Sequence, residues 1–276
     1  MTYATLLVHL ELGRPNDAVL AAAGDLAQRF GSRVVGVAGA QPMQVAYGNG
    51  FLTGQIIQQQ YQEIDAETQV AEAAFRTALA SKATALEWRP AVSFALLSDY
   101  IAAEARCADL VVTGVGRSAA RVDSARHLDT GELAMRAGRP LFIVPPEARR
   151  VAFGHVMVGW KDTAVTRRAV YDALPLLRTA ERVTIVEIAP QDDLDAARGR
   201  LADVASWLAG HNIAARTLAE PSLGDDSVRV SALAEELEAD VIVAGAYGHS
   251  RLREWMMGGV TRELLLHPRR CTLVAH

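Results

Sequence analysis

An internal repeat limits the folds open to this chain more than any other sequence feature. The segment ADLVVTG at residues 108–114 matches ADVIVAG at residues 239–245. Near the start of each copy, LLV at residues 6–8 matches VMV at residues 156–158. Both pairs keep their order along the chain, so the sequence indicates two copies of one folding unit.

The repeat predicts two domains, residues 1–147 and 152–276. A chain of 276 residues has room for two domains of ordinary size. Pro145 and Pro146 and the polar residues that follow them are typical of a linker. The first copy is longer than the second, and we place its extra residues near 41–60. Residues 41–54 form either a lid or a surface loop.

Short apolar runs alternate with amphipathic helical patterns in each copy. In the second copy we predict strands at 155–159, 182–188, 214–218, 240–245 and 271–275, and helices at 164–177, 194–209, 227–237 and 258–266. In the first copy a helix is predicted at 17–30. Such alternation favours parallel sheets covered by helices on both faces. The predicted fold class is α/β, with two doubly wound sandwiches.

Composition excludes several classes of function. The formal net charge is −4 and aromatic residues make up 6%, so no nucleic-acid surface is indicated. No apolar run is long enough to cross a membrane, and the histidines lack metal-ligand spacing. Cys107 and Cys271 are expected in the core rather than in a disulfide. We therefore expect a cytoplasmic protein that binds neither nucleic acid nor a membrane, with no metal site.

A glycine-rich loop carries the clearest chemical signal. Residues 245–261 have the pattern G-x2-G-x9-G-G-V-T, which begins at a predicted strand end and closes at a predicted helix start. Glycines let a backbone approach an anion closely, and free N–H groups at a helix N-terminus attract one. The loop therefore suits a phosphate group. The alternative is that the glycines only turn the chain and start the helix.

The two α/β copies, together with this loop after the fourth strand, resemble the universal stress protein family in its tandem form. The resemblance implies a five-stranded, mostly parallel, Rossmann-like sheet in each unit. It also implies an ATP or related adenine nucleotide, with which Mg²⁺ can be bound. The units of such proteins pair through their last strands, here residues 141–145 and 271–275, as an internal pseudo-dimer.

Carried over by position, the resemblance assigns a nucleotide site to the second unit. The phosphate loop is Gly245, Gly248, Gly258, Gly259, Val260 and Thr261, and Ala244 lies beside the ribose. The adenine wall comes from Gly159, Trp160, Lys161 and Ile188. Two positions depart from the family pattern: Lys161 replaces an Asp, and Gly259 replaces a Ser or Thr. Losing two neutral hydrogen bonds costs about 10–100-fold in affinity.

The first unit departs further from the pattern. Leu128 and Asp129 lie where the later glycines are expected, and a carboxylate there repels an anion. Glu11 keeps an acid at the family's Asp position. We expect no ATP in this unit.

Three functions stay open at this point. The first is a binding or sensing module whose second unit holds an adenine nucleotide. The second is a nucleotide-free scaffold or protein-interaction module for the stress response. The third is slow ATP hydrolysis, for which Asp162 and Glu254 are near in sequence but no positioned base is evident, so we expect no catalytic residues. A homodimer and an unidentified protein partner are both compatible with the sequence.

Overall fold

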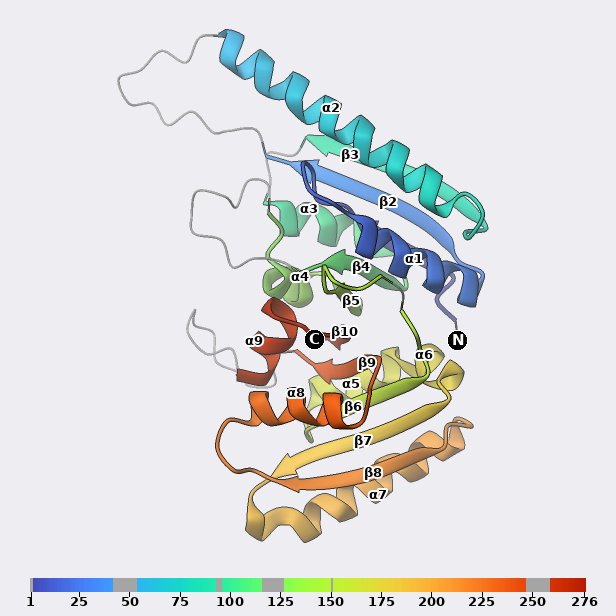
Figure 1. Ribbon diagram of the computed structural model, residues 1–276, viewed down its shortest axis with the longest axis vertical. Helices are drawn as coiled ribbons and strands as arrows, with labels where there is room; N and C mark the ends of the chain where they lie inside the picture. Colours follow the sequence, from blue (N-terminus) through green and yellow to red (C-terminus); the bar gives the residue numbers. More distant parts are fainter. Residues whose placement is uncertain (1, 42–53, 93–95, 116–126, 150, 247–258) are drawn as a thin grey trace, which may run out of the picture.

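The computed structural model describes residues 2–41, 54–92, 96–115, 127–149, 151–246 and 259–276. The described strands form one ten-stranded sheet in the order β3-β2-β1-β4-β5-β10-β9-β6-β7-β8 (Figure 1). In chain order they are β1 Thr5–His9, β2 Arg33–Ala40, β3 Ala85–Val92, β4 Leu110–Gly114, β5 Leu141–Val144, β6 His155–Trp160, β7 Arg182–Ala189, β8 Ala215–Pro221, β9 Val241–Gly245 and β10 Cys271–Ala275.

Helices cover both faces of this sheet. One face packs against α1 Asp17–Phe30, α2 Gly54–Leu79, α5 Ala164–Asp172, α6 Leu174–Thr179 and α7 Leu194–Gly210. The other face packs against α3 Leu97–Glu104, α4 Thr130–Arg136, α8 Asp226–Glu236 and α9 Gly259–Leu266. Short 3₁₀ turns, η1 Ala105–Cys107 and η2 Gln191–Asp193, complete the described elements. The fold is therefore α/β, as predicted.

The two halves of the sheet have the same strand order. Strands β1 to β5 run 3-2-1-4-5 across the first half, and β6 to β10 repeat that order in the second. Within each half the strand pairs are parallel. We call the residues before the junction at 145–154 unit one and the residues after it unit two.

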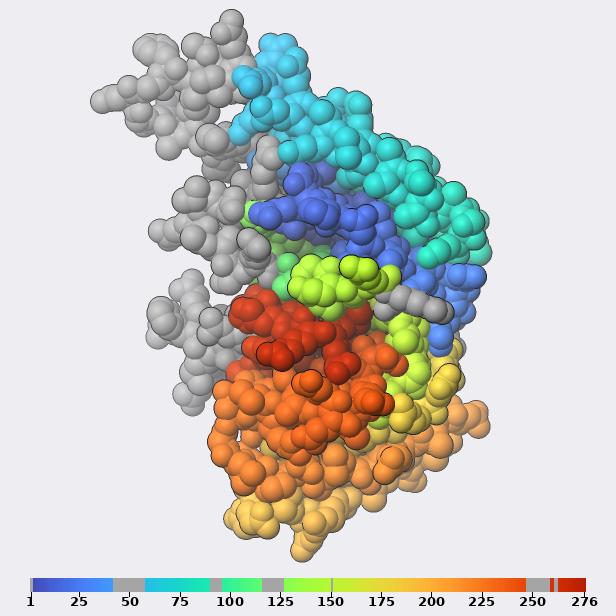
Figure 2. Space-filling model, viewed as in Figure 1, coloured from blue at the N-terminus to red at the C-terminus, as the bar shows by residue number. Residues whose placement is uncertain are grey.

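The units meet through their last strands, which confirms the predicted pairing. Strand β5 pairs with β10 in antiparallel register, with Phe142 opposite Leu273. In the space-filling view the C-terminal segment in red lies directly against the yellow-green end of unit one (Figure 2). One apolar core continues through both units on the α1 and α5 face.

Polar contacts near the N-terminus tie the units together as well. The Tyr3 hydroxyl donates to the Asp172 carbonyl at 2.7 Å, and Arg29 donates to the Thr179 carbonyl at 3.0 Å. The carboxylate of Asp25 accepts from the Val151 N–H at 3.2 Å, just after the paired prolines.

Two sequence expectations need correction. The helix expected at 164–177 divides into α5 and α6 around Ala173, because Pro175 has no N–H to donate back to the preceding turn. Cys107 is exposed rather than in the core, whereas Cys271 is buried as expected. The extra residues of unit one, expected near 41–60, lie partly in α2, which has 26 residues whereas its counterpart α7 has 17. Residues 42–53 lie outside the described part.

Candidate functional site

The sheet of unit two changes direction between β6 and β9. From β6 the chain runs outward through β7 and β8, while β9 and β10 lie on the other side. Ligands in doubly wound sheets bind at such a point, beyond the carboxyl ends of the strands. Gly159 pairs with Ala244 at these ends. We call the region beyond this pair the crevice of unit two, and strand order makes it the candidate site.

Four of the predicted residues lie on one side of the sheet. Ala244 belongs to the core beneath α8 and α9, and Ile188 and Val260 pack against it. Gly159 lies on the same face, two residues after Met157 of that core. A Cβ built at Gly159 meets only the Val243 carbonyl, at 3.8 Å, among its described neighbours. Among the described residues, no side chain comes within 4 Å of that position.

Gly245 has a packing role of its own. A Cβ at this position would lie 2.7 Å from the Thr166 nitrogen and 2.9 Å from the Val165 carbonyl carbon. These are backbone atoms at the start of α5, so they cannot move aside as a flexible side chain would. The first glycine of the loop is thus required for close helix packing, whether or not a phosphate binds nearby.

The loop pattern predicts that a helix starts near Gly258 and Gly259. Helix α9 is described from Gly259 onward and includes Val260 and Thr261. Gly248 and Gly258 lie outside the described residues, so their predicted role stays a prediction. Asp225 lies close by, with a carboxylate oxygen 3.8 Å from the position of a Cβ on Gly259.

Asp225 caps the neighbouring helix α8. Its Oδ1 accepts from the Ser227 N–H at 2.9 Å and from the Ser227 hydroxyl at 2.5 Å. Hydrogen bonding to the Ser227 side chain lowers the pKa of Asp225 below its usual value. A full negative charge therefore stands beside the start of α9 at neutral pH.

One residue predicted for the adenine wall, Trp160, points to the other face of the sheet. Trp160 belongs to the core on the α5 and α7 face, opposite to the face of Gly159. Its side chain cannot form one wall with Gly159, because consecutive strand residues point to opposite faces. Lys161 follows β6 and is exposed, at the rim of the crevice.

The same crevice in unit one is filled by side chains. Strand register makes His9 the counterpart of Gly159, and Thr113 the counterpart of Ala244. Both side chains are buried, and His9 Nδ1 lies 3.0 Å from the Thr113 hydroxyl. Burial lowers the pKa of His9 to about 4, so the ring is neutral at pH 7.

A second pair closes the rim of that crevice. Glu11, the counterpart of Lys161, contacts His127 through its carboxylate. The repeat that matches residues 108–114 with 239–245 puts His127 opposite Gly258 and Leu128 opposite Gly259, one residue earlier than the sequence expectation, which needs this correction. Asp129 then caps α4 by accepting from the Glu132 N–H at 2.9 Å, so the helix start binds a carboxylate of its own chain. These contacts fill the positions at which the resemblance places a nucleotide, and the absence of ATP from unit one stays a prediction.

Sequence reasoning missed His9, Thr113 and His127 as the residues that fill this crevice. A signal was present, because aligning the repeats puts each of them opposite a glycine or alanine of unit two. That their side chains bond in pairs could be learned only from the structure.

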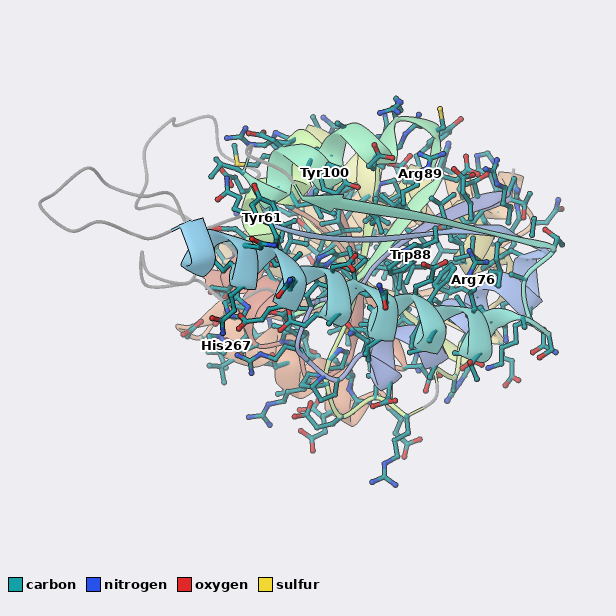
Figure 3. All side chains as sticks on the ribbon, turned by 90° about the horizontal axis from the view of Figure 1, so that it is seen from above. Tyr61, Arg76, Trp88, Arg89, Tyr100 and His267 are labelled. Carbon is teal, nitrogen blue, oxygen red and sulfur yellow. The ribbon has the colours of Figure 1, made fainter. Side chains whose placement is uncertain are left out.

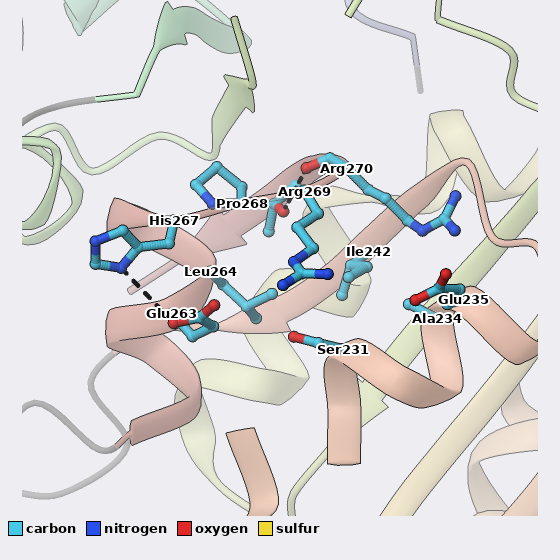
Figure 4. A pocket seen from close by; sticks show the side chains of 11 residues that line it. Ser231, Ala234, Glu235, Ile242, Glu263, Leu264, His267, Pro268, Arg269 and Arg270 are labelled. Atoms are coloured by element: carbon cyan, nitrogen blue, oxygen red, sulfur yellow. Dashed lines mark hydrogen bonds and ion pairs between the residues drawn. The ribbon is translucent and has the colours of Figure 1, made fainter. Parts of the chain in front are cut away.

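A hollow of about 240 Å³ lies near the amino ends of β9 and β10 (Figure 4). It is formed by α8, α9 and the start of β10, with Arg269 reaching over Ser231 and His267 lying 3.6 Å from Glu263. Because it faces the amino ends of the strands, it is separate from the candidate site.

Within the described ranges, no group of three or more His, Cys, Asp or Glu residues could hold a metal ion. Among the same residues, no helix is long and apolar enough to cross a membrane.

The fold and the crevice together define a two-unit Rossmann-like α/β protein. No protein-family model and no curated protein matches the sequence. Among solved structures, a universal stress protein from Archaeoglobus fulgidus DSM 4304 matches with a TM-score of 0.73 and 14% identity, covering 100% of this chain and 99% of that one.

Two proteins from Pseudomonas aeruginosa are also similar over nearly the whole chain. One, of unknown function, comes from strain PAO1 and has a TM-score of 0.64, 14% identity and coverage of 99% and 92%. The other is described as a putative universal stress protein from strain UCBPP-PA14, with a TM-score of 0.63, 16% identity and coverage of 99% and 93%. The chain has the fold of universal stress proteins, with two units in one polypeptide.

Proposed function

We propose that this chain is a universal stress protein whose second unit binds ATP or a related adenine nucleotide at the carboxyl ends of β6 and β9. The contrast between the two crevices carries the proposal. Unit one fills its crevice with His9 and Thr113, while unit two has Gly159 and Ala244 at the same places. Small residues at a switch point leave the space that a ligand needs.

The residues of unit two suit the parts of a nucleotide. Phosphates would lie at the start of α9, near Gly259, Val260 and Thr261, where N–H groups and the helix dipole favour an anion. The ribose would lie beside Ala244, and the base would rest on the surface around Gly159 and Ile188. Lys161 at the rim would pair with a phosphate.

Any Mg²⁺ would come with the nucleotide. Since the described residues hold no metal cluster, phosphates and water would supply most of its ligands. The proposed role is a cytoplasmic binding or sensing module, in which occupancy changes the contacts of the loop. The exposed thiol of Cys107 supports a reducing compartment.

A nucleotide-free scaffold is the second candidate. Lys161 and Gly259 depart from the family pattern, and the charge of Asp225 beside Gly259 opposes a phosphate there. Nucleotide binding in unit two would eliminate this candidate.

The test is to denature freshly purified protein and identify any released nucleotide by chromatography, followed by calorimetric titration with ATP. The decisive variant combines Gly159→His with Ala244→Thr, which copies the filled crevice of unit one. We expect it to fold, because unit one accommodates the same pair, and to bind ATP at least about a hundredfold more weakly.

The matched control is Thr113→Ala, which changes the equivalent strand of unit one. We expect it to leave the stoichiometry and affinity for ATP unchanged. Absence of both released nucleotide and binding heat in the unmodified protein would refute the proposal and favour the scaffold.

A further inference from the structure

Strand β8 forms the outer edge of the sheet in unit two (Figure 1). The Ser222 N–H, just after this strand, donates to the Ala189 carbonyl of β7 at 2.8 Å, so the even-numbered residues of β8 face β7 with their backbone groups. The N–H groups of Ala215, Thr217 and Ala219 therefore point outward. No described residue accepts a hydrogen bond from them. Such an edge is a template for a further strand.

The outer edge of unit one is partly satisfied by its own side chains. The Thr84 N–H bonds to the Ser32 carbonyl on the β2 side, so the Arg89 carbonyl of β3 points outward. This carbonyl accepts from the Tyr100 hydroxyl of α3 at 3.2 Å. Figure 3 shows Arg89 and Tyr100 on the side of β3 opposite to α2. In the aligned repeats Ser231 takes the place of Tyr100, and no described side chain bonds to the β8 edge.

Two copies of β8 can pair through these outward groups in antiparallel register. With Leu218 opposite Leu218 of the second copy, Thr217 lies opposite Ala219, and these two residues exchange both backbone hydrogen bonds. The Ala215 N–H then meets the Pro221 carbonyl. Pro221 has no N–H, but it lies at the end of the strand, so the ladder between the copies is interrupted only there.

Charge favours this register over its neighbours. It places Arg216 opposite Glu220, at a position where facing side chains are closest. Centring the pair on Arg216 or Glu220 instead puts like charges opposite each other. Centring it on Thr217 or Ala219 leaves both charged residues without an opposite charge. Arg216 is exposed and has no ion pair with a described residue, whereas Glu220 is held in place by Arg229 at 2.7 Å.

Helix α7 leaves room for a second copy beside it. It packs over β7 and β8, and strands are spaced about 4.8 Å apart, so twofold symmetry places α7 and its copy about 10 Å apart, a normal distance for packed helices. Arg200 and Trp207 lie on the flank toward β7 and α5. The other flank carries Ala202, Ala205 and Ala209, whose small side chains permit this approach.

We propose that this chain forms a twofold dimer in which the β8 edges of two copies pair in antiparallel register around Leu218. The two sheets then continue as one, and each copy satisfies the outward backbone groups of the other. Two reciprocal pairs of Arg216 with Glu220 fix the register. Because the interface lies at the outer edge of unit two and the crevice lies beyond β6 and β9, the dimer is independent of the proposed nucleotide site.

The test measures the mass of the full-length protein by sedimentation velocity over a range of concentrations, together with amide exchange by NMR. We expect a reversible dimer in the micromolar range. The amides of Thr217 and Ala219 should be protected from exchange only at concentrations where the dimer forms. The Leu218 amide faces β7 and should be protected at all concentrations.

A proline at the centre of the edge tests the backbone pairing. Thr217→Pro removes an outward N–H and leaves the bonds of β8 to β7 in place, so we expect a folded monomer. Thr217→Ala is the matched control, because it keeps the N–H, and it should dimerise like the unmodified protein.

Charge reversal tests the register without a change in the backbone. Arg216→Glu places carboxylates opposite each other and Glu220→Lys places cations opposite each other, so each alone should weaken the dimer at least about tenfold. An equal mixture of the two variants should recover the affinity, because the mixed dimer pairs opposite charges at both places. Arg14→Glu makes the same charge change at an exposed position of unit one and should dimerise normally.

A monomer at every concentration would overturn the proposal. A dimer in which the Thr217 and Ala219 amides exchange freely, or one that Thr217→Pro leaves intact, would overturn it as well, because another surface would then hold the copies together. Failure of the mixture to recover the affinity would reject the register around Leu218.

Discussion

At the scale of single residues, buried His9 makes the free energy of unfolding depend on pH. Its pKa in the folded protein is about 4, lowered by burial, against an ordinary value near 6.5. On acidification the unfolded chain therefore takes up the proton first. The contribution of neutral His9 to stability is complete above about pH 6.5 and is lost as the pH falls toward 4.

This linkage predicts a loss of unfolding free energy of about 3 kcal/mol from His9 between pH 6.5 and 4. Urea unfolding at a series of pH values measures it. His9→Gln keeps a polar group near Thr113 but does not titrate, so its stability should fall less over that interval. An identical pH profile for both proteins would contradict the assignment.

Asp225 allows a second residue-scale prediction, which rests on the proposed nucleotide site. Its negative charge lies beside Gly259, where a phosphate would bind. Asp225→Asn removes the charge while keeping a residue that caps helices well. We expect ATP to bind about two- to fivefold more tightly at low salt, with the gain disappearing as salt screens the charge.

Calorimetric titration at two salt concentrations measures this effect. Asp195→Asn is the control, because it removes the same charge from a side chain that is 97% exposed on α7. Weaker binding in Asp225→Asn would show the opposite of what we expect, and would mean that the carboxylate helps to hold a cation on the phosphates.

At the scale of secondary-structure elements, the packing of α5 on β9 depends on Gly245. An added Cβ would come within 2.7 Å of helix backbone, so α5 would have to shift. We expect Gly245→Ala to lower the free energy of unfolding by about 1–3 kcal/mol. Gly159→Ala is the matched control, because its nearest described neighbour is 3.8 Å away, and it should change stability little.

Urea midpoints of the two alanine variants provide the comparison. Equal stability of both would mean that α5 adjusts freely to a side chain at Gly245. Gly245 would then be needed for the loop that follows it and not for the packing of α5.

Individual helices and strands show what sequence alone can predict. The strand expected at 271–275 is β10, and the helix expected at 17–30 is α1. Apolar period and terminal residues suffice for these, because both are local signals. The break at Ala173 also has a local cause, Pro175, which the helical pattern around it concealed.

The candidate site was less predictable, for a physical reason. A resemblance assigns positions, but side-chain direction follows from the alternation of a strand, which puts Trp160 and Gly159 on opposite faces. The filling of the first crevice by His9 and Thr113 depends on two strands whose contact residues are far apart in sequence. Long-range pairing of this kind is not encoded in any local pattern.

At the scale of the whole molecule, the continuous sheet should make the two units unfold together. Phe142 is fully buried at the junction, opposite Leu273 of β10, and its ring lies 6.3 Å from that of Phe153. The core around it includes residues of both units. A loss of packing at Phe142 therefore weakens the contacts between the two units.

We predict that Phe142→Ala lowers the free energy of unfolding by about 3–5 kcal/mol. Hydrogen exchange should accelerate equally in peptides from β3 and β8, the two outer strands, because global opening exposes both. Met135→Ala, at a side chain 55% exposed on α4, should change neither. Faster exchange confined to one of the outer strands would mean that the units open separately, and the shared core would then contribute little to their cooperation.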